Sequence, residues 1–504
     1  MMSLSELRKT AGNANVIPVT LEFPADLLTP VSAYLRLSRG SSRAFLFESV
    51  EGGEHLARYS FLGVDPYACL KIEDGSLSLE KLGAKAPKTG SKKIRPQKIP
   101  GNPFAAIGNH LAKYRGARRP GLPPFTGGAV GYVGYESVQY LEDIKTPLDK
   151  AGVYDASLML YRSVVAFDHV RRSVVLIHNI FLDEENWEAG YRRAQRELKK
   201  LQARLSRPAP SEVPLVLGDD SGKIPKLQAT LGPEAFANAV TQVKKHIRQG
   251  DIFQCVLSDE FQFPFRGDTF AIYRSLRSTS PAPYLFHLAL GEETLLGASP
   301  EMLTRVSGGR VESCPIAGTR PRGKDEAEDQ RFERQLLESV KERAEHLMLV
   351  DLGRNDIGRV SRPGSVTVPE FMQVHRFSNV MHLVSRVEGK MDSRLSPWDA
   401  LGSCFPAGTL SGAPKIRAME IIADLEPTQR GPYGGAVVYA DFSGSLDSCI
   451  TIRSLFVREG VGRIRAGAGV VADSQASREY EEILNKTKAI RKAVTMATVR
   501  KKSS

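Results

Sequence analysis

Glutamates that recur at helical spacing are the residues of this chain best suited to chemistry. The segment Asp325–Arg343 is rich in Glu, Arg, Gln and Leu, which favour helix formation, so we predict a helix there. Apolar residues at steps of three and four predict its buried face, namely Leu336, Val340, Ala344 and Leu347. Carboxylates recur at the same steps on an adjacent face, namely Glu338, Glu342 and Glu345. Because such carboxylates repel one another unless a positive charge lies there, this face is either solvated or part of a cation site.

The residues after this helix favour the second alternative. Met348–Leu352 is apolar except for Asp351, and the charged and polar run Arg354-Asn355-Asp356 follows closely. We predict a buried, charge-dense turn at this run. A turn of this kind directly after an acidic helix indicates a functional site.

A second acidic helix is predicted near the C-terminus, over Ser477–Ala493. Its apolar stripe consists of Tyr480, Ile483, Thr487 and Ile490. Glu479 and Glu482 lie three residues apart and share one face. Glu482 could form an ordinary exposed pair with Lys486, which would contribute about 0.3–0.5 kcal/mol. Alternatively, the two acidic helices could meet across one Mg²⁺, a hard cation that binds one or two carboxylates, several waters and an anionic substrate oxygen. Spacing alone leaves both alternatives open.

The length and composition describe a globular protein without membrane segments. The chain has 504 residues, which exceeds one ordinary core and favours two domains or one large composite domain. No apolar run approaches the roughly 20 residues of a membrane span, and Met1–Asn15 lacks the apolar core of a signal peptide. The five cysteines are scattered without a C-x-x-C motif, so we expect a cytoplasmic protein with no zinc site.

The formal charge of +12 raises the possibility of a nucleic-acid-binding protein. However, much of the excess lies in Lys81–Lys98, which contains no acidic residue, and in the C-terminal run Arg500–Lys502. The Lys81–Lys98 segment contains no Phe, Tyr or Trp, whereas single-stranded nucleic acids are bound by cations interleaved with aromatic side chains. We therefore expect solvated segments and no nucleic-acid partner. A general positive bias also suits an anionic small substrate.

The order of the expected elements favours an α+β fold. Strands are expected at Arg43–Val50, Arg58–Val64, Thr126–Val133 and within Ser157–Ile180, and helices at Leu21–Leu37, Glu185–Leu205 and Pro233–Gln249. A further strand is expected at Ile252–Leu257, directly after Gly250-Asp251 ends the last of these helices. Beyond it, strands and helices mix without a regular βαβ alternation, which favours α+β layering over a doubly wound sheet. Arg207–Pro214 has the composition of a linker. We divide the chain into an N-terminal region (1–206), a linker (207–226) and a second domain (227–504).

Four Gly-rich segments of the second domain could bind an anionic ligand. They read CPIAGTRPRG at Cys314–Gly323, FPAGTLSGAPKIRAMEII at Phe405–Ile422, GPYGGA at Gly431–Ala436 and AGAGVV at Ala466–Val471. Glycine lets the backbone approach a ligand closely. Pro414 lies near the first turn of a predicted helix, whose free N–H groups would attract an anion. Each segment by itself is also compatible with an ordinary tight turn.

Taken together, these segments resemble the chorismate-utilising enzymes, and most closely the large components of anthranilate synthases. The resemblance runs from about Pro233 to Ala493 and extends more weakly upstream. Its motifs are IRQGDIFQCVLS, PAPYLFH, GASPEML, PIAGTRPRG, AEHLMLVDLGRND, VMHLVS, FPAGTLSGAPK, AGAGVV and EYEEILNKTKA, with FLFESVEGGEHLARYSFLG and GGAVGYVGYE upstream.

The resemblance implies a large composite α/β sandwich with antiparallel-rich sheets and helices packed outside. It also implies roles for particular residues. It makes His382, Glu301, Thr319 and Gln254 the catalytic group, with Glu301 as the acid near the leaving hydroxyl and His382 acting in the loss of pyruvate. It assigns substrate binding to Gly318, Thr319, Tyr433, Arg453 and the backbone of Gly467, Ala468 and Gly469. It assigns Mg²⁺ to Glu345 and Glu482, with Glu342 and Glu479 in the outer shell. The implied substrate, chorismate, carries two carboxylates and an allylic hydroxyl, which suit these residue types.

Two positions distinguish members of the resembled family. Aminodeoxychorismate synthases typically have a nucleophilic lysine where this chain has Ala317, and isochorismate and salicylate synthases have a water-activating lysine at Gln254. Neither residue can do that chemistry, so anthranilate is the expected product and the enzyme a carbon–oxygen lyase of tryptophan biosynthesis. Aminodeoxychorismate synthase, or another chorismate-utilising enzyme, remains the alternative.

The resemblance also implies regulation and a partner. The FLFES segment and its neighbour Arg58–Phe61 resemble the tryptophan site of the family, which would use Ser49, Pro283, Tyr284 and Leu285. Some relatives have Met in place of Leu285. No nucleophilic elbow of a glutaminase is present in the sequence, so the implied partner is a glutamine amidotransferase subunit, in a heterotetramer.

Overall fold

The computed structural model of the chain describes residues 1–49, 58–82, 97–98, 102–147, 152–208, 226–377 and 380–498. Most of the basic segment predicted at 81–98, the basic run at 500–502 and most of the linker predicted at 207–226 lie outside these residues. None of the helices in the described ranges is long and apolar enough to span a bilayer.

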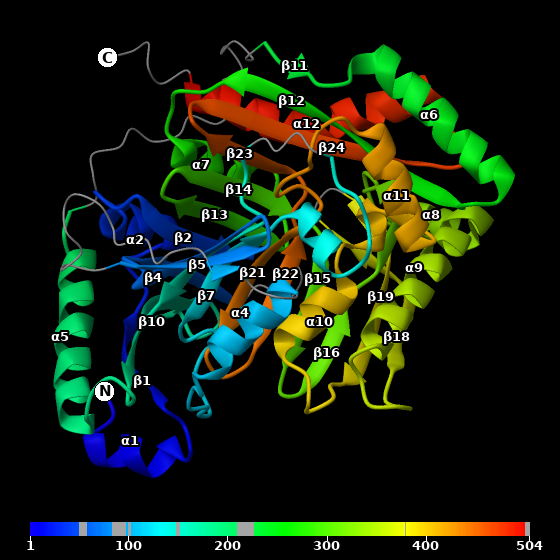
Figure 1. Ribbon diagram of the computed structural model, residues 1–504. Coiled ribbons are helices and arrows are strands. Elements are labelled where there is room, and N and C mark those ends of the chain that lie inside the picture. The colour runs from blue at the N-terminus through cyan, green and yellow to red at the C-terminus, as the bar shows by residue number, and fades with distance from the viewer. Residues whose placement is uncertain are drawn as a thin grey trace.

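Two large sheets, each of 12 strands within the described residues, form the body of the molecule (Figure 1). Neighbouring strands run antiparallel, as in the β12–β24 and β2–β13 pairs. The first sheet has the order β1 (Val16–Pro24), β10 (Ser173–Phe181), β9 (Ser163–Asp168), β3 (Tyr59–Val64), β2 (Arg43–Glu48), β13 (Tyr284–Leu290), β14 (Glu293–Ser299), β23 (Ser454–Arg458), β24 (Val461–Val470), β12 (Gln254–Pro264) and β11 (Gln228–Ala229), with β20 (Gly412–Ala413) beside β12.

The second sheet begins at the right of Figure 1 and ends near the N-terminal strands. Its order is β17 (Ile316–Pro321), β19 (Val380–Lys390), β16 (Arg310–Ser313), β15 (Met302–Ser307), β22 (Leu446–Ile450), β21 (Ala436–Asp441), β7 (Gly128–Val133), β8 (Ala156–Tyr161), β4 (Ala68–Glu73), β5 (Ser76–Lys81) and β6 (Gln97–Lys98), with β18 (Thr367–Arg376) beside β19.

Helices cover the outer faces of the two sheets. On the first sheet, α12 (Ala476–Thr498) packs against β24 and α5 (Trp187–Leu205) against β10. On the second, α9 (Val340–Gly358) packs against β19 and α10 (Pro397–Cys404) against β15. The other helices of the described residues are α1 (Leu4–Ala11), α2 (Pro30–Leu37), α4 (Pro103–Ala112), α6 (Gly232–Gln249), α7 (Thr269–Thr279), α8 (Glu326–Glu338) and α11 (Lys415–Leu425), with 3₁₀ turns η1 (Tyr135–Tyr140) and η2 (Gly408–Leu410).

A core rich in aromatic residues lies between the two sheets. Phe45 and Phe286 of the first sheet and Tyr132 and Tyr161 of the second are almost fully buried in one cluster. The rings of Phe45 and Tyr161 meet edge to face with centroids 4.8 Å apart, an arrangement that aromatic pairs favour. This sandwich with helices outside confirms the predicted α+β class.

Strands from both predicted regions of the chain share both sheets. In the first sheet, β2 pairs with β13, so that Glu48 lies opposite Leu285. In the second, β7 pairs with β21, so that Val133 lies opposite Ala436. The division at 206–226 stays a prediction, and the two sides of it are joined by continuous backbone hydrogen bonding.

Several local predictions are confirmed where the periodicity of the sequence is clear. The α6 helix buries Phe236, Val240 and Val243, and Gly250 ends it at a φ of +81°, a left-handed conformation that glycine adopts without strain. By contrast, the helix expected over Leu21–Leu37 is only α2, because the residues up to Pro24 belong to the edge strand β1.

The helix expected over Asp325–Arg343 is in fact two helices. Ser339 ends α8 and begins α9, where its Oγ accepts a hydrogen bond from the Glu342 amide at 3.4 Å. The predicted apolar stripe is confirmed at the buried Leu336 but is wrong in α9, where Val340 is 80% exposed and Leu347 is 46% exposed. The α9 helix instead turns the face of His346, Leu349 and Val350 inward. Glu338 consequently lies on a different helix from the other two glutamates.

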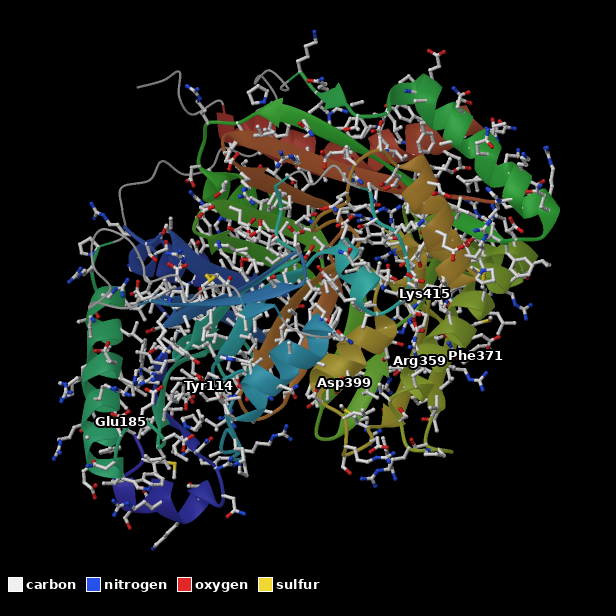
Figure 2. The ribbon with its side chains drawn as sticks, in the orientation of Figure 1. Tyr114, Glu185, Arg359, Phe371, Asp399 and Lys415 are labelled. Carbon is white, nitrogen blue, oxygen red and sulfur yellow. The ribbon has the colours of Figure 1, made fainter. Side chains whose placement is uncertain are left out.

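The turn predicted at Arg354-Asn355-Asp356 is also wrong, because these residues continue α9. Arg354 pairs with Asp351 on the exposed side of the helix. Asp356 is buried and accepts a hydrogen bond from Lys415 at 2.8 Å, at the start of α11, where Lys415 is labelled in Figure 2. A buried ion pair of this geometry joins α9 to α11.

Candidate active site

A cavity of about 530 Å³ lies where β12 and β24 of the first sheet approach β17 and β19 of the second. The α9 and α12 helices also contribute to its wall. It brings together residues that the sequence spreads over more than 200 positions, namely Gln254, Glu301, Gly318, Thr319, Glu345, His382, Tyr433, Arg453, Gly467, Gly469, Glu479 and Glu482. Of the residues assigned to chemistry, Glu342 and Ala468 do not line this cavity.

His382 is held in one orientation by β17. Its Nδ1 lies 2.8 Å from the Gly318 carbonyl oxygen and 3.2 Å from the Thr319 hydroxyl. A carbonyl oxygen can only accept, so Nδ1 carries the proton and Nε2 keeps its lone pair. Burial lowers the pKa of His382, so the ring is neutral at neutral pH. His382 can therefore accept a proton at Nε2.

Gly318 makes this contact possible. It lies at a φ of +65° in an irregular step of the β17–β19 pairing. A Cβ at this position would lie 2.8 Å from the Leu336 side chain and 3.0 Å from Glu342 Oε2. The position therefore needs glycine for both its backbone conformation and its space.

Glu301 lies between β14 and β15 and faces the same cavity. Its Oε1 accepts a hydrogen bond from the Thr409 hydroxyl at 3.1 Å. Desolvation raises the pKa of Glu301 to about 7, although the Thr409 bond and the positive charge of Arg453 oppose the shift. A carboxyl group with such a pKa holds its proton part of the time at neutral pH, as a general acid must.

Arg453 presents a guanidinium without a carboxylate partner to the cavity. Across the described ranges no ion pair involves its side chain, although burial lowers its pKa and the nearby Glu301 raises it. Its backbone has a φ of +48°, which is strained for a residue with a side chain. Strain of this kind is typical of functional sites, and a planar guanidinium is suited to bind a carboxylate.

The glycines of β24 give two side chains room to approach the strand. A Cβ on Gly467 would lie 2.8 Å from the Tyr433 hydroxyl, and one on Gly469 would lie 2.6 Å from the Gln254 amide nitrogen. In the described part of the sheet, β23 pairs only with 461–463 of β24, so residues 464–470 have a strand partner only on the β12 side. Their other edge is available to an anionic ligand.

Carboxylates from α9 and α12 line the same cavity. Glu345 and Glu482 both line it, and burial, Glu342 and Glu482 together raise the pKa of Glu345. Glu342 forms an ion pair with Arg320, whose guanidinium nitrogen lies 3.3 Å from Glu342 Oε1. Within the described ranges no group of three or more Asp, Glu, His or Cys side chains is close enough to hold a metal ion. Two carboxylates on one cavity wall still fit Mg²⁺, which takes its other ligands from water and substrate.

Two lysines of the cavity wall, Lys341 and Lys486, are not among the predicted site residues. The expected pair of Lys486 with Glu482 is present at 2.7 Å. However, Lys486 also donates to the Gly467 carbonyl oxygen at 2.8 Å. The i, i+4 spacing from Glu482 to Lys486 was the signal that placed this ammonium on the acidic face.

A second cavity of about 260 Å³ lies between the sheets. Ser49, Pro283, Tyr284 and Leu285, the residues assigned to tryptophan, all line it, together with Phe47, Tyr59, Phe61, Tyr439 and others. Its polar side carries Arg305, which bonds Asp447 at 2.9 Å and the Tyr284 hydroxyl at 3.3 Å. Aromatic rings beside carboxylate and guanidinium groups suit an aromatic amino acid. Pro283 also lines the first cavity, so one short segment borders both.

The comparisons with known proteins agree with this geometry. A family model described as chorismate binding enzyme matches residues 43–492. The chain belongs to the chorismate-binding enzyme family. This chorismate-binding enzyme is 42% identical over 498 residues to anthranilate synthase component 1 of Acetivibrio thermocellus, covering 98% of each chain.

Solved structures extend the comparison. The crystal structure of anthranilate synthase component I from Streptococcus pneumoniae TIGR4 matches with a TM-score of 0.76 and 36% identity, over 92% of this chain and 98% of that one. The menaquinone-specific isochorismate synthase from Escherichia coli shares the fold, with a TM-score of 0.71 at 17% identity over 97% of this chain and 98% of that one. The resemblance drawn from the motifs is thereby confirmed, and the chain is an enzyme of this family.

Proposed function

We propose that this chorismate-binding enzyme makes anthranilate and pyruvate from chorismate and ammonia, as the large subunit of an anthranilate synthase. The observation that carries the proposal is that Ala317 and Gln254 occupy the cavity wall. Neither side chain can form a covalent amine adduct or activate water as a base. Free ammonia is then the nucleophile. The names of the full-length relatives, anthranilate synthase component 1, support the same product.

In the first step, ammonia forms a C–N bond at ring carbon 2 while the C–O bond at carbon 4 breaks and the ring double bonds shift. Glu301 donates its proton to the departing hydroxyl, which leaves as water. Because its pKa is raised to about 7, the Glu301 carboxyl still holds that proton part of the time at neutral pH. The carboxylate left on Glu301 regains a proton from the ammonium group formed at carbon 2, through water.

In the second step, the ring becomes aromatic. His382 Nε2 takes the proton from carbon 2, and the C–O bond at carbon 3 breaks. The enolpyruvyl group takes up at its methylene carbon the proton that the His382 imidazolium returns through water, and departs as pyruvate. The neutral ring that Gly318 orients is the form that can accept this proton.

The substrate carboxylates would be bound by groups that are already in place. Arg453 and the Tyr433 hydroxyl would hold the enolpyruvyl carboxylate against the open edge of β24. Glu345 and Glu482 would hold Mg²⁺, with Glu479 and Glu342 behind them, and the ion would neutralise the ring carboxylate when bound. Gly318 and Thr319 would contact the same end of the ring.

The second cavity would bind tryptophan, and the bound tryptophan would inhibit the enzyme. The aromatic wall of Phe47, Phe61 and Tyr439 would enclose the indole ring, and Ser49 and Asp447 would contact its polar end. Because Pro283 borders both cavities, an occupant of the second can press on the wall of the first. The inhibitor would thus act without entering the reaction cavity.

Ammonia would come from a separate glutamine amidotransferase subunit, in a heterotetramer. The test of the function is product analysis by chromatography on the purified chain with chorismate and Mg²⁺. We expect anthranilate with ammonium salt at high pH, and none with glutamine until the partner is added. Isochorismate or aminodeoxychorismate as the main product would overturn the proposal. Glutamine-dependent activity of the purified chain by itself would overturn the need for a partner.

A further inference from the structure

Lys486 connects the acidic helix α12 to the glycine strand β24. Its Nζ lies 2.7 Å from Glu482 Oε1 and 2.8 Å from the carbonyl oxygen of Gly467. An ordinary i, i+4 pair on an exposed helix has no second anchor and is weak. The bond to Gly467 holds this ammonium at the wall of the reaction cavity, which both Lys486 and Glu482 line.

The ammonium lies in a region of negative potential. Glu345, Glu479 and Glu482 line the same cavity. Burial and the negative charges of Glu342 and Glu482 raise the pKa of Glu345, and the positive charges of Lys341 and Lys486 oppose this shift. Of these two lysines, Lys486 is the one whose ammonium pairs with Glu482, a carboxylate that a divalent cation would need. A carboxylate oxygen of Glu482 that bonds the ammonium is not available to a metal ion in the same geometry.

We propose that the Lys486 ammonium, held by Gly467, competes with Mg²⁺ for Glu482. When the metal binds Glu482, the ammonium pairs with a carboxylate of the substrate instead. Without metal, Lys486 neutralises Glu482. When Mg²⁺ takes Glu482, the ammonium stays beside Gly467, on the strand that faces the substrate carboxylate, and pairs with that carboxylate. The inference rests on the metal and substrate sites of the proposed function.

This exchange makes metal and substrate binding cooperative. Chorismate draws Lys486 away from Glu482 and so raises the affinity for Mg²⁺, and Mg²⁺ frees Lys486 and so raises the affinity for chorismate. The two effects are equal, as linkage requires. A lysine that only stabilised the fold would produce no such coupling.

The test uses the purified full chain and Lys486→Met, with Mn²⁺ binding followed by electron paramagnetic resonance and Mg²⁺ binding by calorimetry. Without chorismate, we expect the variant to bind either metal about 3- to 10-fold more tightly, since one competing ion pair is removed. At saturating Mg²⁺, we expect it to bind chorismate at least about 10-fold more weakly, because one charge-assisted contact is lost. Opposite shifts in the two affinities are the signature of the exchange.

Lys488→Met is the matched control. Lys488 is exposed on the same helix, carries the same charge and is not part of the cavity wall. It should leave both affinities within about 2-fold of the wild type, because exposed charges are screened. If Lys486→Met leaves metal affinity unchanged or weakens it, Lys486 is not the competitor.

Glu482→Gln separates failure of this inference from failure of the metal site itself. In that background, Lys486→Met should no longer change the affinity for Mn²⁺. If Glu482→Gln by itself leaves Mn²⁺ affinity unchanged, the proposed metal site is wrong. If it abolishes Mn²⁺ binding while Lys486→Met has no effect in the wild type, only the inference about Lys486 is wrong.

Discussion

The Nδ1 atom of His382 lies 2.8 Å from the carbonyl oxygen of Gly318, across the pairing of β19 with β17. This contact assigns the tautomer of the only histidine on the wall of the reaction cavity, among the residues that the structure describes. The glycine is needed because its φ of +65° is a left-handed backbone conformation that residues with a side chain rarely adopt. The proposed base of the second step is thus positioned by the backbone of the neighbouring strand.

Replacing His382 should separate the two steps of the reaction. We expect His382→Gln to lower anthranilate formation by about 10²- to 10⁴-fold, the usual contribution of a general base. The first step does not use His382, so the aminated intermediate should accumulate and be detectable by chromatography and mass spectrometry. Equal loss of chorismate consumption and anthranilate formation would contradict a role confined to the second step.

The raised pKa of Glu301 predicts a pH dependence of turnover. The protonated carboxyl is the acid, so kcat measured at a fixed concentration of free ammonia should fall as pH rises through about 7. Glu301→Gln should remove this limb and lower kcat by about 10²-fold or more. A kcat that rises across this range at constant free ammonia would speak against Glu301 as the acid.

The same group should affect stability with a defined sign. The folded pKa of Glu301, about 7, lies above the ordinary value of 4.5, so its contribution to the free energy of unfolding is complete below pH 4.5 and lost as pH rises through 7. Glu301→Gln cannot ionise. Its melting temperature relative to the wild type should therefore rise between pH 5 and pH 8, as calorimetry can measure.

The two metal carboxylates should be necessary for turnover but not for folding. We expect Glu345→Gln and Glu482→Gln to retain the circular dichroism spectrum and to lose at least about 10²-fold in activity at limiting Mg²⁺. Glu338→Gln is a suitable control because Glu338 is exposed on α8 and does not line the cavity. Activity like that of the wild type in either cavity variant would refute the assignment.

Tryptophan inhibition should depend on the second cavity. Ser49→Phe places a ring in a cavity of about 260 Å³, so it should leave uninhibited activity near normal and raise the tryptophan concentration for half inhibition by about 10-fold or more. The measurement is the inhibition curve at fixed chorismate. An unchanged curve would show that the inhibitor site lies elsewhere.

Crowding of the glycine strand should affect substrate binding. A methyl group at Gly467 would lie 2.8 Å from both the Tyr433 hydroxyl and the Leu257 carbonyl oxygen, so we expect Gly467→Ala to raise KM for chorismate by about 10-fold. Gly462 lies on the same strand as Gly467 but outside the cavity, and a methyl group there would crowd the Phe263 ring. Gly462→Ala therefore controls for a general defect of β24. Equal effects of the two variants on KM would assign the loss to the strand rather than to the site.

Local elements and the identity of the site residues could be predicted from the sequence because they depend on short-range patterns. The stripe of Phe236, Val240 and Val243 defines α6, since residues three and four apart share a helix face. The stripe around Ile483 and Ile490 likewise defines the buried face of α12. The motifs carried the resemblance to chorismate-utilising enzymes, and the family comparison confirms it.

Tertiary structure decided which face of α9 turns inward. Periodicity assigned Val340 and Leu347 to the core, yet both are exposed, because the facing sheet takes up Leu349 and Val350 and the cavity takes up Glu345. A helix face is chosen by the surface that packs against it, and the sequence of the helix does not contain that surface. The ammonium of Lys486 at the Gly467 carbonyl has the same origin, since this contact depends on how α12 packs against β24. Pairing between distant strands, such as β2 with β13, depends on backbone hydrogen bonds. Every residue type except proline can form these bonds, so the sequence of a strand does not identify its partner.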